Sequence, residues 1–126
     1  MTTAELIEIS KKAQEFAYAP YSKFKVGAAL LCRDGSVYTG CNIENATYGA
    51  TNCAERTAVF KAVSEGKSDF TAIAITSSGK GLTFPCGICR QVLSEFSSEI
   101  KVILEDDKGE LHTFMLPELL PHSFTL

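Results

Sequence analysis

Three cysteines in two separate stretches constrain this chain more than any other feature of its sequence. Cys53 stands in the first stretch, and Cys86 and Cys89 stand in the second with two residues between them. On a helix, Cys86 and Cys89 would lie one turn apart on the same face and share one ion, with Cys53 as the third ligand. Structural zinc sites have four protein ligands, whereas catalytic sites keep three and leave the fourth position open. The sequence therefore predicts a fold that brings these thiols together around one Zn²⁺ ion per chain.

The residues before the cysteines predict that two helices begin at the metal. Asn52 is a good N-cap for a helix that starts at Cys53, and Pro85 suits the entry to a helix at Cys86. The positive ends of both helix dipoles would then favour the thiolate form that zinc needs.

Glu55 and Arg56 follow Cys53 at positions that suit proton transfer and charge balance. Glu55 could reach a water on the metal, which makes it a candidate proton shuttle; its alternative is an ion pair with Arg56 or Arg90. Three thiolates on Zn²⁺ leave one negative charge, which makes a bound water harder to deprotonate. We therefore expect Arg56 to donate hydrogen bonds to the sulfurs, with Arg90 as a second candidate and a surface salt bridge as the alternative.

Composition limits the class of protein. The chain has 126 residues, 45% of them hydrophobic, which predicts one domain over residues 1–126. The net charge is -3 and no stretch concentrates basic residues, so a nucleic acid polymer is not expected as a partner. The chain shows no apolar run long enough to cross a bilayer and no pattern typical of a signal peptide. Its odd number of cysteines favours free thiols over disulfides. We expect a cytoplasmic protein without membrane contact, in which Cys32 and Cys41 are ordinary buried strand residues.

The pattern of apolar residues and turn signals predicts helices that alternate with strands. Helices are expected at 3–18, 53–66 and 86–96, with a helical turn at 117–120, and strands at 25–32, 37–41, 70–76, 101–105 and 111–115. The run 42–52 reads as a loop. This order predicts an α/β fold, a three-layer α-β-α sandwich with a central mixed sheet of about five strands.

Cys53-Ala54-Glu55 followed by Pro85-Cys86-x-x-Cys89 resembles the signature of zinc-dependent nucleobase deaminases, with cysteine in place of the more common histidine. Over nearly its whole length the chain resembles the cytidine deaminases of the short, homotetrameric type. The resemblance implies hydrolytic deamination of free cytidine and deoxycytidine to uridine and deoxyuridine, with release of ammonia, as in pyrimidine salvage. Zinc would activate a water, and Glu55 would pass its proton first to ring N3 and then to the leaving amine.

The resemblance also implies which residues contact the small nucleoside substrate. It assigns Asn42 and Glu44 to the ribose hydroxyls, Phe24 to the pyrimidine ring and Ala54 to the substrate pocket. It implies a homotetramer in which Phe124 enters a neighbour's active site. Taken alone, Asn42 and Glu44 fit a simple turn, Phe24 fits a core position, and Phe124 fits a loose tail.

Two other functions remain open at this point. A deaminase of a cytosine-containing antibiotic nucleoside such as blasticidin S has the same chemistry and a similar second cysteine stretch, although Asn42 and Glu44 favour a plain ribose. A structural zinc module for binding is the alternative from another class, and the missing fourth protein ligand argues against it. His112 and His122 lie in an expected strand and in the tail, away from the cysteine stretches.

Overall fold

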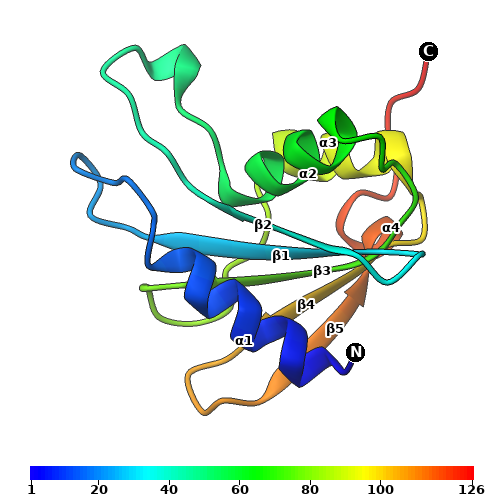
Figure 1. Cartoon of the computed structure of the whole chain (residues 1–126), viewed down its shortest axis with the longest axis horizontal. Coiled ribbons are helices and arrows are strands. Elements are labelled where there is room, and N and C mark those ends of the chain that lie inside the picture. Colours follow the sequence, from blue (N-terminus) through cyan, green and yellow to red (C-terminus); the bar gives the residue numbers. More distant parts are fainter.

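The computed structural model describes all 126 residues and has five strands in one sheet between helices (Figure 1). The elements in chain order are α1 (Thr3–Gln14), β1 (Val26–Cys32), β2 (Val37–Cys41), a 3₁₀ turn (Tyr48–Ala50), α2 (Ala54–Ser64), β3 (Phe70–Ser77), α3 (Gly87–Phe96), β4 (Lys101–Glu105), β5 (Leu111–Met115) and α4 (Leu116–Leu119). Helix α1 covers one face of the sheet, and α2 and α3 cover the other. The predicted three-layer sandwich is confirmed.

The sheet is mixed, as predicted, with strand order β2-β1-β3-β4-β5. Strand β1 pairs antiparallel with β2 and β3, and β4 pairs antiparallel with β5. The one parallel pair is β3 with β4, and α3 forms the crossover between them. Helix α3 therefore starts beyond the carboxyl end of β3, a common position for binding sites in α/β folds.

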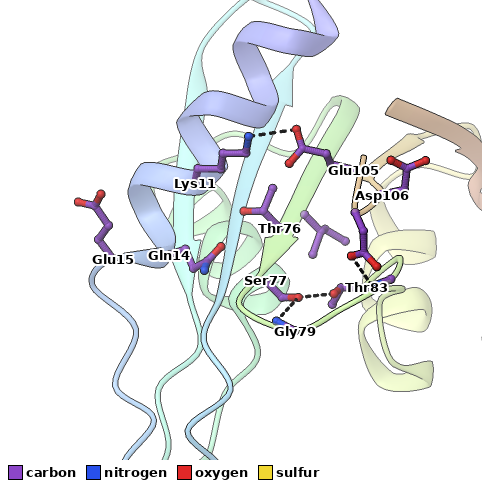
Figure 2. A pocket seen from close by; sticks show the side chains of 12 residues that line it. Lys11, Gln14, Glu15, Thr76, Ser77, Gly79, Thr83, Glu105 and Asp106 are labelled. Atoms are coloured by element: carbon purple, nitrogen blue, oxygen red, sulfur yellow. Dashed lines mark hydrogen bonds and ion pairs between the residues drawn. The ribbon is translucent and has the colours of Figure 1, made fainter. Parts of the chain in front are cut away.

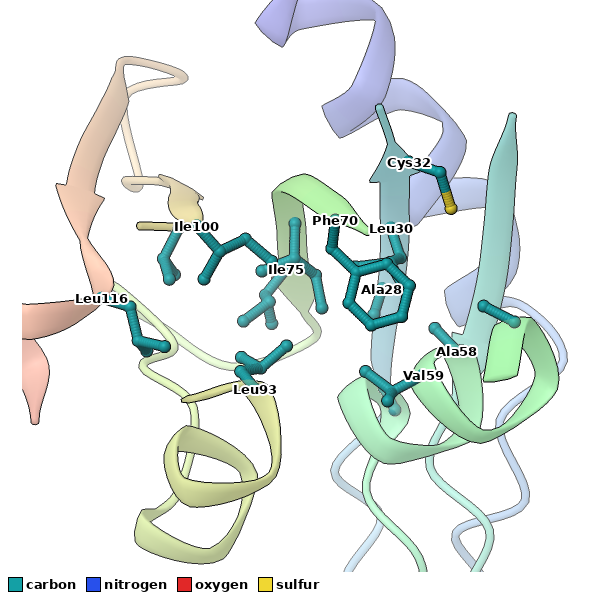
Figure 3. Close-up of a cluster of buried hydrophobic side chains, with 14 of the residues drawn as sticks. Ala28, Leu30, Cys32, Ala58, Val59, Phe70, Ile75, Leu93, Ile100 and Leu116 are labelled. Atoms are coloured by element: carbon teal, nitrogen blue, oxygen red, sulfur yellow. The ribbon is translucent and has the colours of Figure 1, made fainter. Parts of the chain in front are cut away.

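Two apolar layers hold the sandwich together. The larger lies between the sheet and the helices α2 and α3, where Phe70, Ile75 and Leu93 are fully buried (Figure 3). The smaller lies under α1, around Leu6 and Ile7. Each fully buried side chain of this size stabilises the fold by about 1.5–3 kcal/mol.

Two glycines let helices approach the sheet more closely than any other residue would allow. A Cβ on Gly27 would lie 2.0 Å from the carbonyl oxygen of Ser10 in α1. A Cβ on Gly40 would lie 2.3 Å from the carbonyl oxygen of Ala54 and 2.5 Å from the backbone nitrogen of Ala58, both in α2. Gly40 therefore sets how deeply the start of α2 lies against β2.

The observed elements differ from the expected ones mainly at helix ends. Helix α1 ends at Gln14, because the backbone N–H groups of residues 15–17 bond three residues back and tighten the chain into a turn. The other bounds agree with the sequence to within two residues. None of the helices has both the length and the apolar character needed to cross a membrane.

Candidate active site

The starts of α2 and α3 bring the three predicted metal ligands together. Cys53 is the N-cap of α2 and Cys86 is the N-cap of α3, and Cys89 lies in the first turn of α3. The predicted capping role of Asn52 is wrong by one position: its side-chain amide donates to the Thr57 hydroxyl instead (3.2 Å). Both helix dipoles nevertheless point their positive ends at the sulfurs, as expected.

The spacing of the sulfurs fits a zinc ion. The Sγ atoms of Cys53 and Cys86 are 3.8 Å apart, and those of Cys86 and Cys89 are 3.5 Å apart. All three lie within 4.8 Å of one another, and none forms a disulfide. Zn–S bonds of about 2.3 Å at tetrahedral angles place two ligand sulfurs about 3.8 Å apart. Three thiolates from one chain therefore match Zn²⁺ with one position left for a non-protein ligand.

Neighbouring groups divide the charge unequally among the thiols of the zinc-free protein. Hydrogen bonding from Cys89, followed by the Arg56 guanidinium, lowers the pKa of Cys53 to about 5. The same interaction with Cys53, together with burial, raises the pKa of Cys89. Arg56 Nη2 lies 3.1 Å from Cys53 Sγ, which is the contact expected for charge balance. Arg90 does not share this role, because its guanidinium donates to the carbonyls of Pro85 and Leu119.

Glu55 is the one buried carboxyl group of the chain, with a relative exposure of 5%. It lies in the first turn of α2, two residues from Cys53. Burial, supported by the negative charge of Cys53, raises the pKa of the Glu55 carboxyl to about 7. It makes no ion pair with Arg90. A carboxyl group with this pKa can both take and give a proton near neutral pH.

A cavity of about 230 Å³ opens beside the cysteines and Glu55. It is lined by seven of the predicted site residues, namely Phe24, Asn42, Glu44, Cys53, Ala54, Glu55 and Cys86. Cys89 is buried, with its Sγ beside that of Cys86, and Arg56 reaches the Cys53 sulfur from α2. The structure therefore gathers residues from the first third of the chain around the start of α2 and α3.

Asn42 and Glu44 also shape the wall of this cavity. Asn42 donates to the Phe24 carbonyl (2.7 Å) and accepts from the Val26 N–H (2.9 Å). Glu44 accepts from the N–H groups of Tyr21 and Ser22 and from the Ser22 hydroxyl, and these bonds lower the pKa of the Glu44 carboxyl. An amide offers four hydrogen-bonding positions and a carboxylate about four, so both keep capacity for a ligand.

Six further residues line the cavity that the sequence did not assign to substrate or metal: Ser22, Val26, Thr51, Asn52, Thr83 and Phe84. Thr83 and Phe84 directly precede Pro85 and Cys86, and this adjacency was a usable signal. Phe84 packs against Phe114 of β5, with ring centroids 5.2 Å apart. Phe124 does not line the cavity of its own chain, because the tail lies along α3.

A larger cavity of about 420 Å³ lies at the carboxyl ends of β3 and β4, on the side of α1 (Figure 2). Lys11 of α1 pairs with Glu105 across it (3.0 Å), and the hydroxyls of Ser77 and Thr83 bond to each other on its floor. Its walls are polar and hold neither a cysteine nor Glu55. Thr83 lines both cavities, but Cys53, Cys86 and Glu55 line only the smaller one.

Comparison with known proteins identifies relatives over almost the full length. Residues 1–105 match the family described as the cytidine and deoxycytidylate deaminase zinc-binding region. The cytidine deaminase of Sporosarcina psychrophila is 52% identical over 126 residues, which are 99% of this chain and 93% of that protein. The cytidine deaminase of Halalkalibacterium halodurans is 54% identical over 121 residues, which are 95% of this chain and 92% of that protein.

A solved structure has the same fold. The crystal structure of cytidine deaminase from Burkholderia pseudomallei is 49% identical in sequence and superposes with a TM-score of 0.93, covering 98% of this chain and 100% of that chain. The matched segment contains all three cysteines and Glu55. With its three converging thiols and its buried glutamate, this chain belongs to the zinc-dependent cytidine and deoxycytidylate deaminase family.

Proposed function

We propose that this protein hydrolytically deaminates free cytidine and deoxycytidine to uridine and deoxyuridine, with residues 1–126 acting as one catalytic domain. Water adds its oxygen to ring C4, the C4–N bond breaks, and ammonia leaves. The observation that carries the proposal is a buried carboxyl group, Glu55, beside three metal-ligating thiols at one open cavity. A purely structural zinc module would need neither the cavity nor an open ligand position.

Glu55 performs the proton transfers. Cys53, Cys86 and Cys89 hold zinc, which when bound supplies a Lewis acid that makes water acidic enough to ionise near neutral pH. Glu55 takes the first proton of the attacking water and delivers it to ring N3. It then takes the second proton from the new C4 hydroxyl and gives it to the departing amine as the C4–N bond breaks. Burial, which raises the pKa of Glu55 to about 7, suits it to both roles.

The residues around the cavity bind the nucleoside. Asn42 and Glu44 provide an amide and a carboxylate for the sugar hydroxyls, and Phe24 offers an aromatic face to the pyrimidine. Ala54 is fully buried where α2 begins, so it limits the depth of the cavity. Glu44 would repel a nearby phosphate, which favours a free nucleoside over a nucleotide. A plain ribose diol therefore fits better than the sugar of an antibiotic nucleoside.

The protein is proposed to act as a homotetramer in the cytoplasm. Large apolar side chains lie exposed over several elements, including Phe16, Tyr48, Phe60 and Ile88. Such surfaces are typical of protein interfaces. In the tetramer Phe124 covers the base bound by a neighbouring subunit. All five cysteines are free thiols, which is typical of a reducing compartment such as the cytoplasm.

The decisive experiment follows the fall in ultraviolet absorbance of cytidine at neutral pH for the parent and for Glu55→Ala. Glu55→Ala should keep about one zinc per chain but lose a factor of about 10²–10⁴ in turnover, because general acid–base catalysis is worth that much. A strong chelator should abolish activity of the parent. Turnover of Glu55→Ala within tenfold of the parent would rule out the proposed mechanism. Blasticidin S as a second substrate distinguishes the antibiotic alternative.

A further inference from the structure

Gln91 of α3 binds the backbone of Phe124 through both ends of its side-chain amide. Gln91 Nε2 donates to the Phe124 carbonyl oxygen (2.7 Å), and Gln91 Oε1 accepts from the Phe124 N–H (3.1 Å). One amide thus satisfies both backbone polar groups of a residue 33 positions away. Among residues 121–126, Phe124 alone hydrogen-bonds to the rest of the chain.

Arg90, the preceding residue of α3, holds the other end of the same segment. Its Nη1 donates to the Leu119 carbonyl (2.8 Å) and its Nε to the Pro85 carbonyl (2.7 Å). The C-terminal tail leaves α4 and passes α3, as Figure 1 shows. Two successive residues of the helix that carries Cys89 therefore fasten residues 119–124.

The ring of Phe124 gains little burial within its own chain from this arrangement. Its side chain is exposed, with a residue exposure of 66%, although its backbone is tied at both polar groups. Ordering a terminal residue costs conformational entropy, and a largely exposed ring offsets little of that cost by burial. Ordering of this kind is useful where the ring is presented to a second molecule, because the entropy is then lost before binding.

We propose that Gln91 is a positioning residue for substrate binding: it fixes the tail so that the Phe124 ring is ready to cover the base in a neighbouring subunit. This inference rests on the proposed function, in which Phe124 completes a neighbour's site. Because the side-chain amide of Gln91 bonds to the Phe124 backbone and not to a cysteine or Glu55, its removal should change KM and leave the chemical step intact.

The test uses Gln91→Ala, with Glu95→Ala as the matched control. Glu95 is an exposed residue one turn further along α3, and its side chain bonds to no other residue. Gln91→Ala should raise KM for cytidine roughly tenfold, as expected for losing part of a base–aromatic stack, with kcat within about twofold and zinc content unchanged. Hydrogen exchange of the Phe124 amide should become faster in Gln91→Ala and stay at the parent rate in Glu95→Ala.

A double-mutant comparison with Phe124→Ala decides between the remaining outcomes. When the ring is already absent, Gln91→Ala should raise KM no further. Additive effects on KM, or loss of zinc, would overturn the positioning role. Unchanged KM and unchanged amide exchange in Gln91→Ala would also overturn the positioning role of Gln91. The covering role of Phe124 would still stand in that case if Phe124→Ala alone raises KM. If Phe124→Ala leaves KM at the parent value, the proposed covering role of Phe124 fails, and the positioning role fails with it.

Discussion

Substituting Gly40 by alanine tests how strictly the sheet sets the position of the metal ligands. The added Cβ would lie 2.3 Å from the Ala54 carbonyl oxygen and 2.5 Å from the Ala58 nitrogen, about 1 Å short of ordinary contact. Both atoms belong to the helix backbone, so they cannot yield by a rotamer change. The start of α2, with Cys53 at its cap, must therefore move away from β2.

Overpacking of this kind typically costs about 1–3 kcal/mol, and a clash with backbone atoms belongs at the upper end. Displacement of one ligand among sulfurs 3.5–3.8 Å apart should also weaken zinc binding, by roughly 10- to 100-fold if it acts like the loss of a supporting contact. Gly40→Ala should thus lower both the free energy of unfolding in urea and the zinc affinity measured by competition with a chelating dye.

Gly49→Ala is the matched control, because a Cβ at that position meets nothing within 4 Å. If Gly40→Ala has the same stability and zinc affinity as Gly49→Ala, the close approach of α2 to β2 does not fix the position of the helix. A loss of stability with unchanged zinc affinity would refute the link between Gly40 and the metal site.

Three further predictions concern charge and assembly. In the zinc-free protein burial raises the pKa of Glu55 from 4.5 to about 7, so the favourable contribution of this carboxyl is present below pH 4.5 and is lost as pH rises through 7. Relative to the parent, the free energy of unfolding of Glu55→Gln in urea should therefore increase by about 2–3 kcal/mol between pH 5 and pH 8, and a pH-independent difference would contradict this. Arg56→Gln should keep the fold and most of the zinc but raise the acidic pKa of the kcat/KM profile and lower its plateau. Adding Cys53→His should restore part of the lost activity. If the pH profile and the zinc affinity of Arg56→Gln are unchanged, Arg56 has only a structural role. Deleting residues 123–126 should raise KM for cytidine far more than it lowers stability. Sedimentation of the parent as an active monomer would refute the proposed tetramer.

The layered fold and the metal ligands could be predicted because their signals are local. Apolar segments bounded by turn residues predicted the strands, and the cysteine spacing predicted the sulfur cluster that the structure contains. The end of α1 could not be predicted, because residues 15–17 continue the helical pattern while their N–H groups close a tighter turn.

Other features of the site depend on contacts between segments distant in the sequence. The bonds from Asn42 to residues 24 and 26, and from Glu44 to residues 21 and 22, exist only after β1 and β2 have paired. The close approach at Gly40 depends on how α2 lies across the sheet. Neither leaves a periodic pattern in the sequence, so both require the folded chain.

The capping of two helices by metal ligands has a consequence for local unfolding. Cys53 and Cys86 begin helices that are separated by a whole strand in the chain, so a bound ion acts as a cross-link between their first turns. Removing the ion should let these turns fray while the sheet stays closed, since local openings need far less free energy than global unfolding. Amide exchange at residues 54–56 and 87–89 should accelerate on chelation, with β3 unaffected; equal acceleration in β3 would mean that zinc stabilises the whole domain uniformly.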